Sequence, residues 1–250
     1  MQMPRRVALV TGAAQGIGRA VAELLAHRGA AVAVADVNDD GASEVVEAIR
    51  DAGGHAAAVH LDVTSTVSVR AGLATIEGEL GAVDILVNNV GWDELVPFLD
   101  SDEQFWESVI ARNFTGTVRV THAVLPAMLQ RSWGRIVNIS SDAGRVGSVV
   151  EPLYAATKGG VITFTKAVAR DVARAGITVN TVCPGVTDTP ALREVAATRP
   201  GVIDAMTRAV PMRRAGQPSE VAVAVAFFAS EEATYVTGQT LSVSGGLTMV

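Results

Sequence analysis

Seven strand-length apolar runs alternate with segments of helical periodicity, and this alternation constrains the fold more than any other feature. The runs are bounded by Gly, Asp, Asn or Pro and span residues 7–10, 31–35, 56–61, 85–87, 136–139, 177–182 and 240–243. Between the first two, Ile17, Val21 and Leu24 recur at the spacing of one helix face. Strands that are apolar on both faces and separated by helices form covered parallel sheets. The sequence therefore predicts one α/β domain over residues 1–250, a doubly wound parallel sheet of the Rossmann type.

Composition narrows the class of partner. The chain carries a formal net charge of −6 without a basic run, whereas a nucleic-acid surface needs clustered Lys and Arg. No uncharged stretch reaches the roughly 18 apolar residues that indicate a membrane span, and the N-terminal apolar run is too short for a signal peptide. The single cysteine, Cys183, excludes an intrachain disulfide. We expect a cytoplasmic protein with a small-molecule substrate, no nucleic acid and no membrane.

One long segment, 187–217, has no clear sheet strand. It lies between the sixth apolar run and a late helical pattern. Long connections without a strand often close over a site, so this segment is a candidate substrate lid.

A glycine-rich segment follows the first apolar run and leads directly into a helical pattern. Its sequence over 11–18 is TGAAQGIG, which places Gly12, Gly16 and Gly18 at G-x-x-x-G-x-G spacing. The first N–H groups of a helix can hold a pyrophosphate, and glycine lets the backbone approach it. Such a triplet alone also occurs in tight turns, but the strand–loop–helix context favours a dinucleotide site.

Asp36 ends the second apolar run, where a carboxylate can accept hydrogen bonds from both ribose hydroxyls of an adenosine. Its charge would repel a 2′-phosphate, and Val37 follows it in place of an Arg or Lys that could offset the repulsion. The alternative is an ordinary turn aspartate at a strand end. With the glycine loop beside it, Asp36 indicates NAD in preference to NADP.

Tyr154 and Lys158 stand four residues apart on an expected helix and therefore share one face. A nearby cation favours the phenolate, which brings the proton exchange of a tyrosine closer to neutral pH. The pair is thus a candidate acid/base centre, with an ordinary surface pair as the alternative.

At this point the sequence resembles the short-chain dehydrogenase/reductase family over nearly its whole length. The motifs that carry the resemblance are the loop at 11–18, Asn88-Asn89-Val90-Gly91, Ser141, the 154–158 pair and Pro184-Gly185. The resemblance implies a catalytic set of Asn113, Ser141, Tyr154 and Lys158. In it Ser141 binds the substrate oxygen, Tyr154 exchanges its proton and Asn113 anchors a water that leads to Lys158.

The resemblance also implies the nucleotide contacts. They are Gly12, Gln15, Gly16, Ile17 and Gly18 in the loop, Asp36 at the ribose, Asp62 and Val63 at the adenine, Asn89 and Gly91 at the adenosine ribose, Tyr154 and Lys158 in the catalytic pair, Pro184 and Gly185 at the nicotinamide, and Val186 and Thr189 at its carboxamide. Val90 replaces the usual alanine of its motif, for which we expect a small effect on binding geometry.

Four stretches, 83–93, 134–148, 177–192 and 238–249, are more specifically similar to the 2-hydroxycyclohexanecarboxyl-CoA dehydrogenases. This resemblance implies NAD-dependent oxidation of a β-hydroxyacyl-CoA, with Ser141, Tyr154, Trp92 and Asp142 at the substrate. A tryptophan after a strand is equally well a core residue. Five arginines in the candidate lid, Arg193, Arg199, Arg208, Arg213 and Arg214, could meet CoA phosphates, although scattered solvated arginines explain them too.

Two other functions remain open. A 3-oxoacyl-[acyl-carrier-protein] reductase using NADPH is the nearest enzyme alternative, and Asp36 weighs against it. A non-catalytic dinucleotide sensor shares the fold, but the intact Ser141, Tyr154 and Lys158 disfavour it. The four histidines lack metal-ligand spacing, so we expect no metal. Apolar helix faces within 109–128 and 153–172, with the resemblance, lead us to expect a homotetramer.

Overall fold

The computed structural model describes residues 2–3, 6–149, 151–199 and 201–250. Its centre is a seven-stranded sheet in the order β3-β2-β1-β4-β5-β6-β7, and every neighbouring pair is parallel. The strands are β1 (Val7–Thr11), β2 (Ala31–Asp36), β3 (His55–His60), β4 (Ile85–Asn88), β5 (Gly134–Ile139), β6 (Ile177–Pro184) and β7 (Thr240–Val243). All seven predicted strands and the single α/β fold are confirmed, with bounds shifted by at most two residues at an end.

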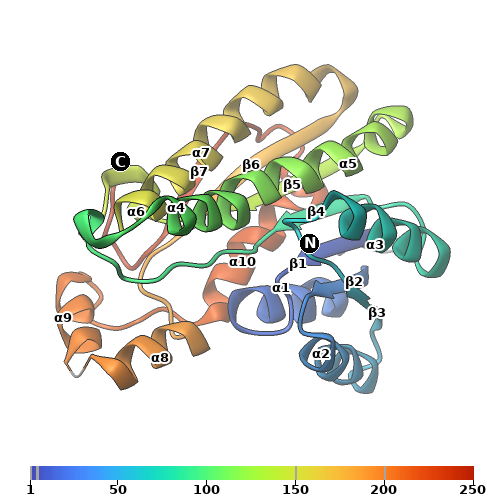
Figure 1. Cartoon of the computed structure of the whole chain (residues 1–250). Coiled ribbons are helices and arrows are strands. Elements are labelled where there is room, and N and C mark those ends of the chain that lie inside the picture. Colours follow the sequence, from blue (N-terminus) through green and yellow to red (C-terminus); the bar gives the residue numbers. More distant parts are fainter. Residues whose placement is uncertain (1, 4–5, 150, 200) are drawn as a thin grey trace.

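Helices cover both faces of this sheet (Figure 1). The helices of eight or more residues are α1 (Gly16–His27), α2 (Asp39–Asp51), α3 (Thr66–Glu79), α4 (Glu103–Ile110), α5 (Gly116–Arg131), α7 (Pro152–Val172), α8 (Pro190–Thr198), α9 (Val202–Ala209) and α10 (Pro218–Phe228); α6 (Ala143–Val146) is a single turn. One apolar core joins the sheet to α1, α2 and α10, and a second joins it to α3, α5 and α7. The structure therefore has three layers, as the alternating pattern predicts.

The strand order reverses between β1 and β4, because the chain builds outward from β1 to β3 and then returns to the other side of β1. In open parallel sheets, ligands bind at the carboxyl ends of the strands beside such a switch point. The loops after β1, β4, β5 and β6 meet there, and they carry most of the candidate residues.

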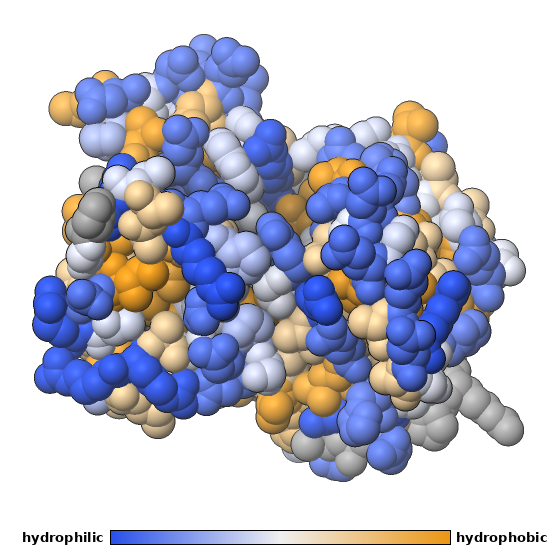
Figure 2. Space-filling model, turned by 90° about the horizontal axis from the view of Figure 1, so that it is seen from below, coloured by the Kyte–Doolittle hydropathy of each residue, from blue (hydrophilic) through white to orange (hydrophobic). Residues whose placement is uncertain are grey.

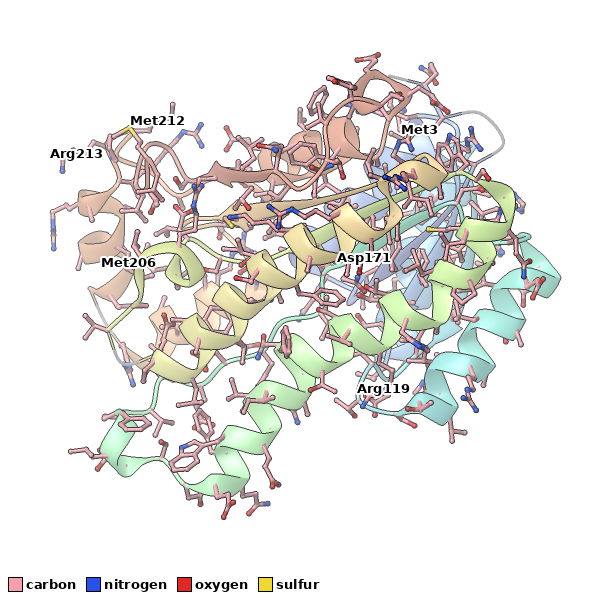
Figure 3. All side chains as sticks on the ribbon, turned by 90° about the horizontal axis from the view of Figure 1, so that it is seen from above. Met3, Arg119, Asp171, Met206, Met212 and Arg213 are labelled. Carbon is pink, nitrogen blue, oxygen red and sulfur yellow. The ribbon has the colours of Figure 1, made fainter. Side chains whose placement is uncertain are left out.

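The candidate lid, 187–217, contains α8 and α9. Its two ends lie side by side near the end of β6. Thr187 pairs with Gly216 in an isolated parallel bridge, and Asp188 N donates to Gly216 O at 2.8 Å. Met206, Met212 and Arg213 lie at the outer edge of the candidate lid, far from Arg119 (Figure 3). Seen from below, the molecule is hollowed between the part that carries α8 and α9 and the part that carries α1 and α2 (Figure 2).

The described residues form neither a membrane-spanning helix nor a cluster of metal-ligating side chains. Within these residues, no helix combines the length and the apolar character that crossing a membrane requires. The same residues contain no group of three or more His, Cys, Asp or Glu side chains placed to hold a metal ion.

Candidate active site

The glycine loop after β1 is shaped by backbone conformation and by close packing. Gly12 and Gly16 have φ angles of +62° and +57°, a region that side-chain-bearing residues rarely adopt. Gly18 is required for a different reason, because a Cβ there would lie 2.1 Å from Gly12 O. Asn89 fastens the loop through Nδ2, which donates to Thr11 O at 3.1 Å and to Gly12 O at 2.9 Å. The glycine loop and α1 are therefore in direct backbone contact, with no space for a side chain at Gly18.

The first turn of α1 faces the space that this loop encloses. Gln15, the residue before the helix, makes no side-chain cap, whereas the Asn38 and Ser65 side chains cap α2 and α3. Uncapped N–H groups and the positive end of the helix dipole suit an anion. Thr189, at the start of α8, stands opposite, with its Cγ2 3.5 Å from where a Cβ on Gly16 would lie. Ile17 belongs to this first turn and packs against the core below.

The Asp36 carboxylate is tied to the glycine loop. Its Oδ2 accepts from Ala14 N at 3.0 Å, and its Oδ1 accepts from Asn38 N at 3.0 Å. Each oxygen keeps acceptor capacity for a further donor. This places a fixed carboxylate next to the loop that would hold a pyrophosphate.

Asp62 and Val63 follow β3 on the neighbouring side. Burial raises the pKa of Asp62, but hydrogen bonds from the Thr64 hydroxyl and N–H outweigh it, so the pKa lies below its ordinary value. Val63 is buried, and its carbonyl accepts from Arg119 Nη1 at 2.5 Å. Both residues are therefore held in place, and their role at an adenine stays a prediction.

The other end of the site is formed where β6 ends. Gly185 N donates to Val243 O at 3.1 Å, and Val186 O accepts from Gly216 N at 2.9 Å. A Cβ on Gly185 would lie 2.7 Å from Ser244 Cβ, so only glycine fits there. Pro184, Val186 and Thr189 continue the same wall. The glycine cradle, Asp36 and this wall together fit an extended dinucleotide at the switch point.

Tyr154 and Lys158 lie one turn apart in α7, which begins at Pro152. Lys158 Nζ is 5.6 Å from the centroid of the Tyr154 ring and donates to Ile139 O at 3.1 Å. Burial lowers the pKa of Lys158 to about 8. Burial also raises the pKa of Tyr154 above its ordinary value, despite a lowering hydrogen bond with Ser141. The sequence predicts a lowered phenol pKa, and this is wrong for the structure because desolvation by burial is the largest influence on the pKa of Tyr154.

Ser141 stands in the loop between β5 and α6. Its Oγ accepts from Ala143 N at 3.1 Å and hydrogen-bonds the Tyr154 side chain. A Cβ on Gly144 would lie 2.6 Å from the carbonyl carbon of Lys158, so α6 packs directly on α7. This close packing holds the serine loop against the helix that carries the tyrosine.

Asn113 lies in a π-helical turn, Ala111–Thr115, between α4 and α5. Its side chain is fully buried; Oδ1 accepts from Trp92 N at 3.0 Å, and Nδ2 donates to Trp92 O at 2.6 Å. Asn113 Oδ1 and Lys158 Nζ lie 3.5 and 3.1 Å from where a Cβ on Gly91 would be. The structure thus gathers the four expected catalytic residues around the loop that follows β4. Asn113 falls within the helical segment 109–128 that the apolar pattern predicts, and the π-turn, which is typical of functional sites, is an addition to that expectation.

Two expected substrate contacts point elsewhere in this structure. The Trp92 ring packs 6.0 Å from Phe105 and lies under the Arg112 guanidinium at 4.4 Å. Asp142 is 4% exposed, and its Oδ1 accepts from Ser242 in β7. Neither residue belongs to the described wall of the pocket at Tyr154. Their contact with substrate remains a prediction.

The pocket beside Tyr154 contains residues that the sequence reasoning missed. Its wall includes Asp93 and Glu151 together with the apolar Val96, Phe105 and Leu153. Burial and the nearby Glu151 charge raise the pKa of Asp93 to about 7. Position in the sequence was the one signal for them: Asp93 follows Trp92 after a central strand, and Glu151 directly precedes α7.

The lid arginines are largely engaged within the protein. Arg193 pairs with Asp188 at 2.8 and 3.0 Å, and Arg214 pairs with Glu220 at 2.6 and 2.7 Å. Arg199 donates to Leu95 O at 3.1 Å, and Arg213 donates to a backbone carbonyl, that of Arg208. These partners favour a role in holding the lid over a role at phosphates.

The chain is similar to known proteins over nearly its whole length. A family model described as Enoyl-(Acyl carrier protein) reductase matches residues 12–248. The chain is 44% identical to "3-oxoacyl-[acyl-carrier-protein] reductase FabG" of Vibrio harveyi and 42% identical to that of Escherichia coli (strain K12), covering 100% of both chains in each case. It also resembles the solved structure "Crystal structure of gox2181", with a TM-score of 0.95, 35% identity and coverage of 98% of this chain and 96% of that one.

Proposed function

The chain belongs to the short-chain dehydrogenase/reductase family, and from that premise we propose that it interconverts 3-oxoacyl and 3-hydroxyacyl thioesters with NAD(H). It is an oxidoreductase with a nicotinamide dinucleotide cofactor and a small-molecule substrate. The observation that carries the proposal is the meeting of Ser141, Tyr154 and Lys158 beside a pocket at the end of the nucleotide cradle.

Each of these residues has one task in the proposal. Ser141 donates a hydrogen bond to the substrate oxygen, and Tyr154 exchanges its proton with that oxygen. Lys158 holds the nicotinamide ribose and supplies positive charge beneath the phenol, with Asn113 anchoring the proton path. The bound nicotinamide supplies or accepts the hydride. A phenol whose pKa is raised by burial remains protonated at neutral pH, which suits donation to a ketone and therefore reduction.

Asp36 supports NAD(H) in this proposal. Because its carboxylate is fixed by Ala14 N and Asn38 N, it could not easily withdraw from a 2′-phosphate. Among the residues immediately beside it, Val37 and Asn38 supply no positive charge. An NADPH-linked 3-oxoacyl reductase is the second candidate, favoured by the names of the two relatives and opposed by this carboxylate.

Two candidate substrates differ in the carrier of the acyl group, which is either acyl carrier protein or CoA. The relatives act, by name, on 3-oxoacyl groups carried by acyl carrier protein. The internal pairing of the lid arginines also weakens the argument for CoA phosphates. We therefore favour an acyl-carrier-protein thioester over the cyclic CoA thioester. The lid at 187–217 and a homotetramer remain part of the proposal.

The test follows NAD(P)H absorbance with purified protein and three substrates: 3-oxohexanoyl-acyl-carrier-protein, 3-oxohexanoyl-CoA and 2-oxocyclohexanecarboxyl-CoA. Each is offered with NADH and with NADPH, and the variant Asp36→Ala is compared with Asp39→Ala, an exposed carboxylate nearby. We expect NADH to be preferred, and only Asp36→Ala to lose that preference. Wild-type preference for NADPH would overturn the cofactor assignment, and absence of turnover with all three thioesters would overturn the reaction.

A further inference from the structure

The pocket that adjoins Tyr154 is lined by both apolar side chains and carboxylates. Its wall is formed by the segment after β4, the start of α4 and the N-terminal turn of α7. Val96, Phe98, Phe105, Pro152 and Leu153 give it apolar surface. Into this surface project carboxylates, chiefly those of Asp93 and Glu151. An alkyl chain alone would leave one of these acceptors, Asp93 Oδ2, without a donor.

Within this pocket, Asp93 has a carboxylate oxygen that accepts no hydrogen bond from the described residues. Its Oδ2 is buried and has no hydrogen-bond partner among the described residues. The N–H of Glu94 hydrogen-bonds the same carboxylate, so the side chain is held in place. Glu151, in contrast, accepts from the Ser148 hydroxyl at 2.6 Å. A buried acceptor without a donor costs free energy that a bound donor would recover.

The electrostatics of the pocket point in the same direction. Asp93, Glu151 and the neighbouring Glu94 place negative charge around it, and no Lys or Arg belongs to its described wall. Burial and these like charges raise the pKa of Asp93 to about 7, because both disfavour the negative charge of its carboxylate. A donor or a cation at Oδ2 would relieve this repulsion, whereas a carboxylate would increase it.

We propose that Asp93 is a specificity-determining residue that binds a hydrogen-bond donor, a hydroxyl or ammonium group, on the acyl chain of the substrate. The same residue disfavours acyl chains that end in a carboxylate. This inference rests on the proposed function, because Tyr154 must be the group that meets the reacting oxygen.

Three N-acetylcysteamine thioesters that differ only at the chain end test this assignment: 3-oxononanoyl, its isostere 8-hydroxy-3-oxooctanoyl, and 3-oxooctanedioyl with a terminal carboxylate. The variants are Asp93→Asn, Asp93→Leu and, as a matched control, Asp100→Asn, an exposed carboxylate on the same segment. Reduction is followed as kcat/KM, and binding of each thioester is measured by calorimetry.

For the wild type and Asp100→Asn we expect the hydroxyl chain to exceed the methyl chain by about tenfold or more, the size of one buried hydrogen bond to a charged group. The carboxylate chain should be the poorest. Asp93→Leu should prefer the methyl chain, and Asp93→Asn should recover part of the carboxylate reaction. Equal kcat/KM for methyl and hydroxyl chains in the wild type, or a preference that persists in Asp93→Leu, would overturn the inference.

The binding measurement separates this inference from the proposed function. If no thioester is reduced but the hydroxyl chain still binds more tightly through Asp93, the reaction is wrong and the donor site stands. If all are reduced without discrimination, the reaction stands and the donor site is wrong.

Discussion

Replacing Gly18 by alanine tests how closely α1 must approach the loop after β1. The added Cβ would lie 2.1 Å from Gly12 O and 2.6 Å from Asn89 Nδ2. Non-bonded heavy atoms pack best at about 3.5 Å, so loop and helix must separate by roughly 1 Å. Overpacking of this kind costs about 1–3 kcal/mol, against about 1 kcal/mol that alanine contributes over glycine inside a helix.

Gly78→Ala is the matched control, because this glycine is also helical and its Cβ would meet nothing within 4 Å. It should stabilise the fold by about 0.5–1 kcal/mol through helix propensity alone. Urea denaturation should therefore rank Gly78→Ala above wild type and Gly18→Ala below Gly78→Ala by about 1–3 kcal/mol. The NADH dissociation constant should rise at least about tenfold in Gly18→Ala, which corresponds to 1.4 kcal/mol, and stay unchanged in Gly78→Ala.

Two results would refute this reasoning. Equal stability of the two variants would mean that the close approach of Gly18 to the loop is not needed. A destabilised Gly18→Ala that binds NADH normally would keep the packing argument but remove the loop from the nucleotide site.

Three further predictions concern the catalytic side. Tyr154→Phe should lower kcat about 10²–10⁴-fold while NADH affinity, measured by fluorescence titration, stays near wild type; unchanged turnover would contradict the proton exchange. Because burial lowers the pKa of Lys158 to about 8, its charge is lost as the pH rises through 8, and kcat/KM should fall there. Lys158→Arg, if active, should lack that alkaline limb. Asn113→Ala should destabilise the fold by about 1–3 kcal/mol in urea, since it leaves the Trp92 N–H and carbonyl without their buried partner; wild-type stability would contradict this.

The parts of the site that sequence predicts are those encoded by neighbouring residues. The glycine loop needs three glycines within seven residues, and its strand and helix are visible as apolar periods on either side. Tyr154 and Lys158 are brought together by a single helical turn. Local geometry of this kind does not depend on how the rest of the chain packs, so the structure agrees with it closely.

The π-turn at Asn113 shows where local reasoning ends. Nothing in the residues of Ala111–Thr115 distinguishes them from an ordinary helix interior, and the widened turn coincides with the carboxamide of Asn113 bonding the backbone of Trp92. That backbone arrives from the loop after β4. The feature therefore depends on a tertiary contact that no window of sequence contains.

The substrate side depends on such tertiary contacts throughout. Trp92 and Asp142 adjoin the site in sequence, yet the Trp92 ring packs on Phe105 and the Asp142 carboxylate accepts from Ser242. Asp93 and Glu151 come from segments more than fifty residues apart and meet only because the segment after β4 and α4 lie beside the start of α7. Nucleotide binding in this fold is a property of backbone shape at one switch point, whereas acyl specificity is a property of side chains delivered by loops. The two can therefore change independently, so resemblance over the whole chain predicts the cofactor class more strongly than the acyl group.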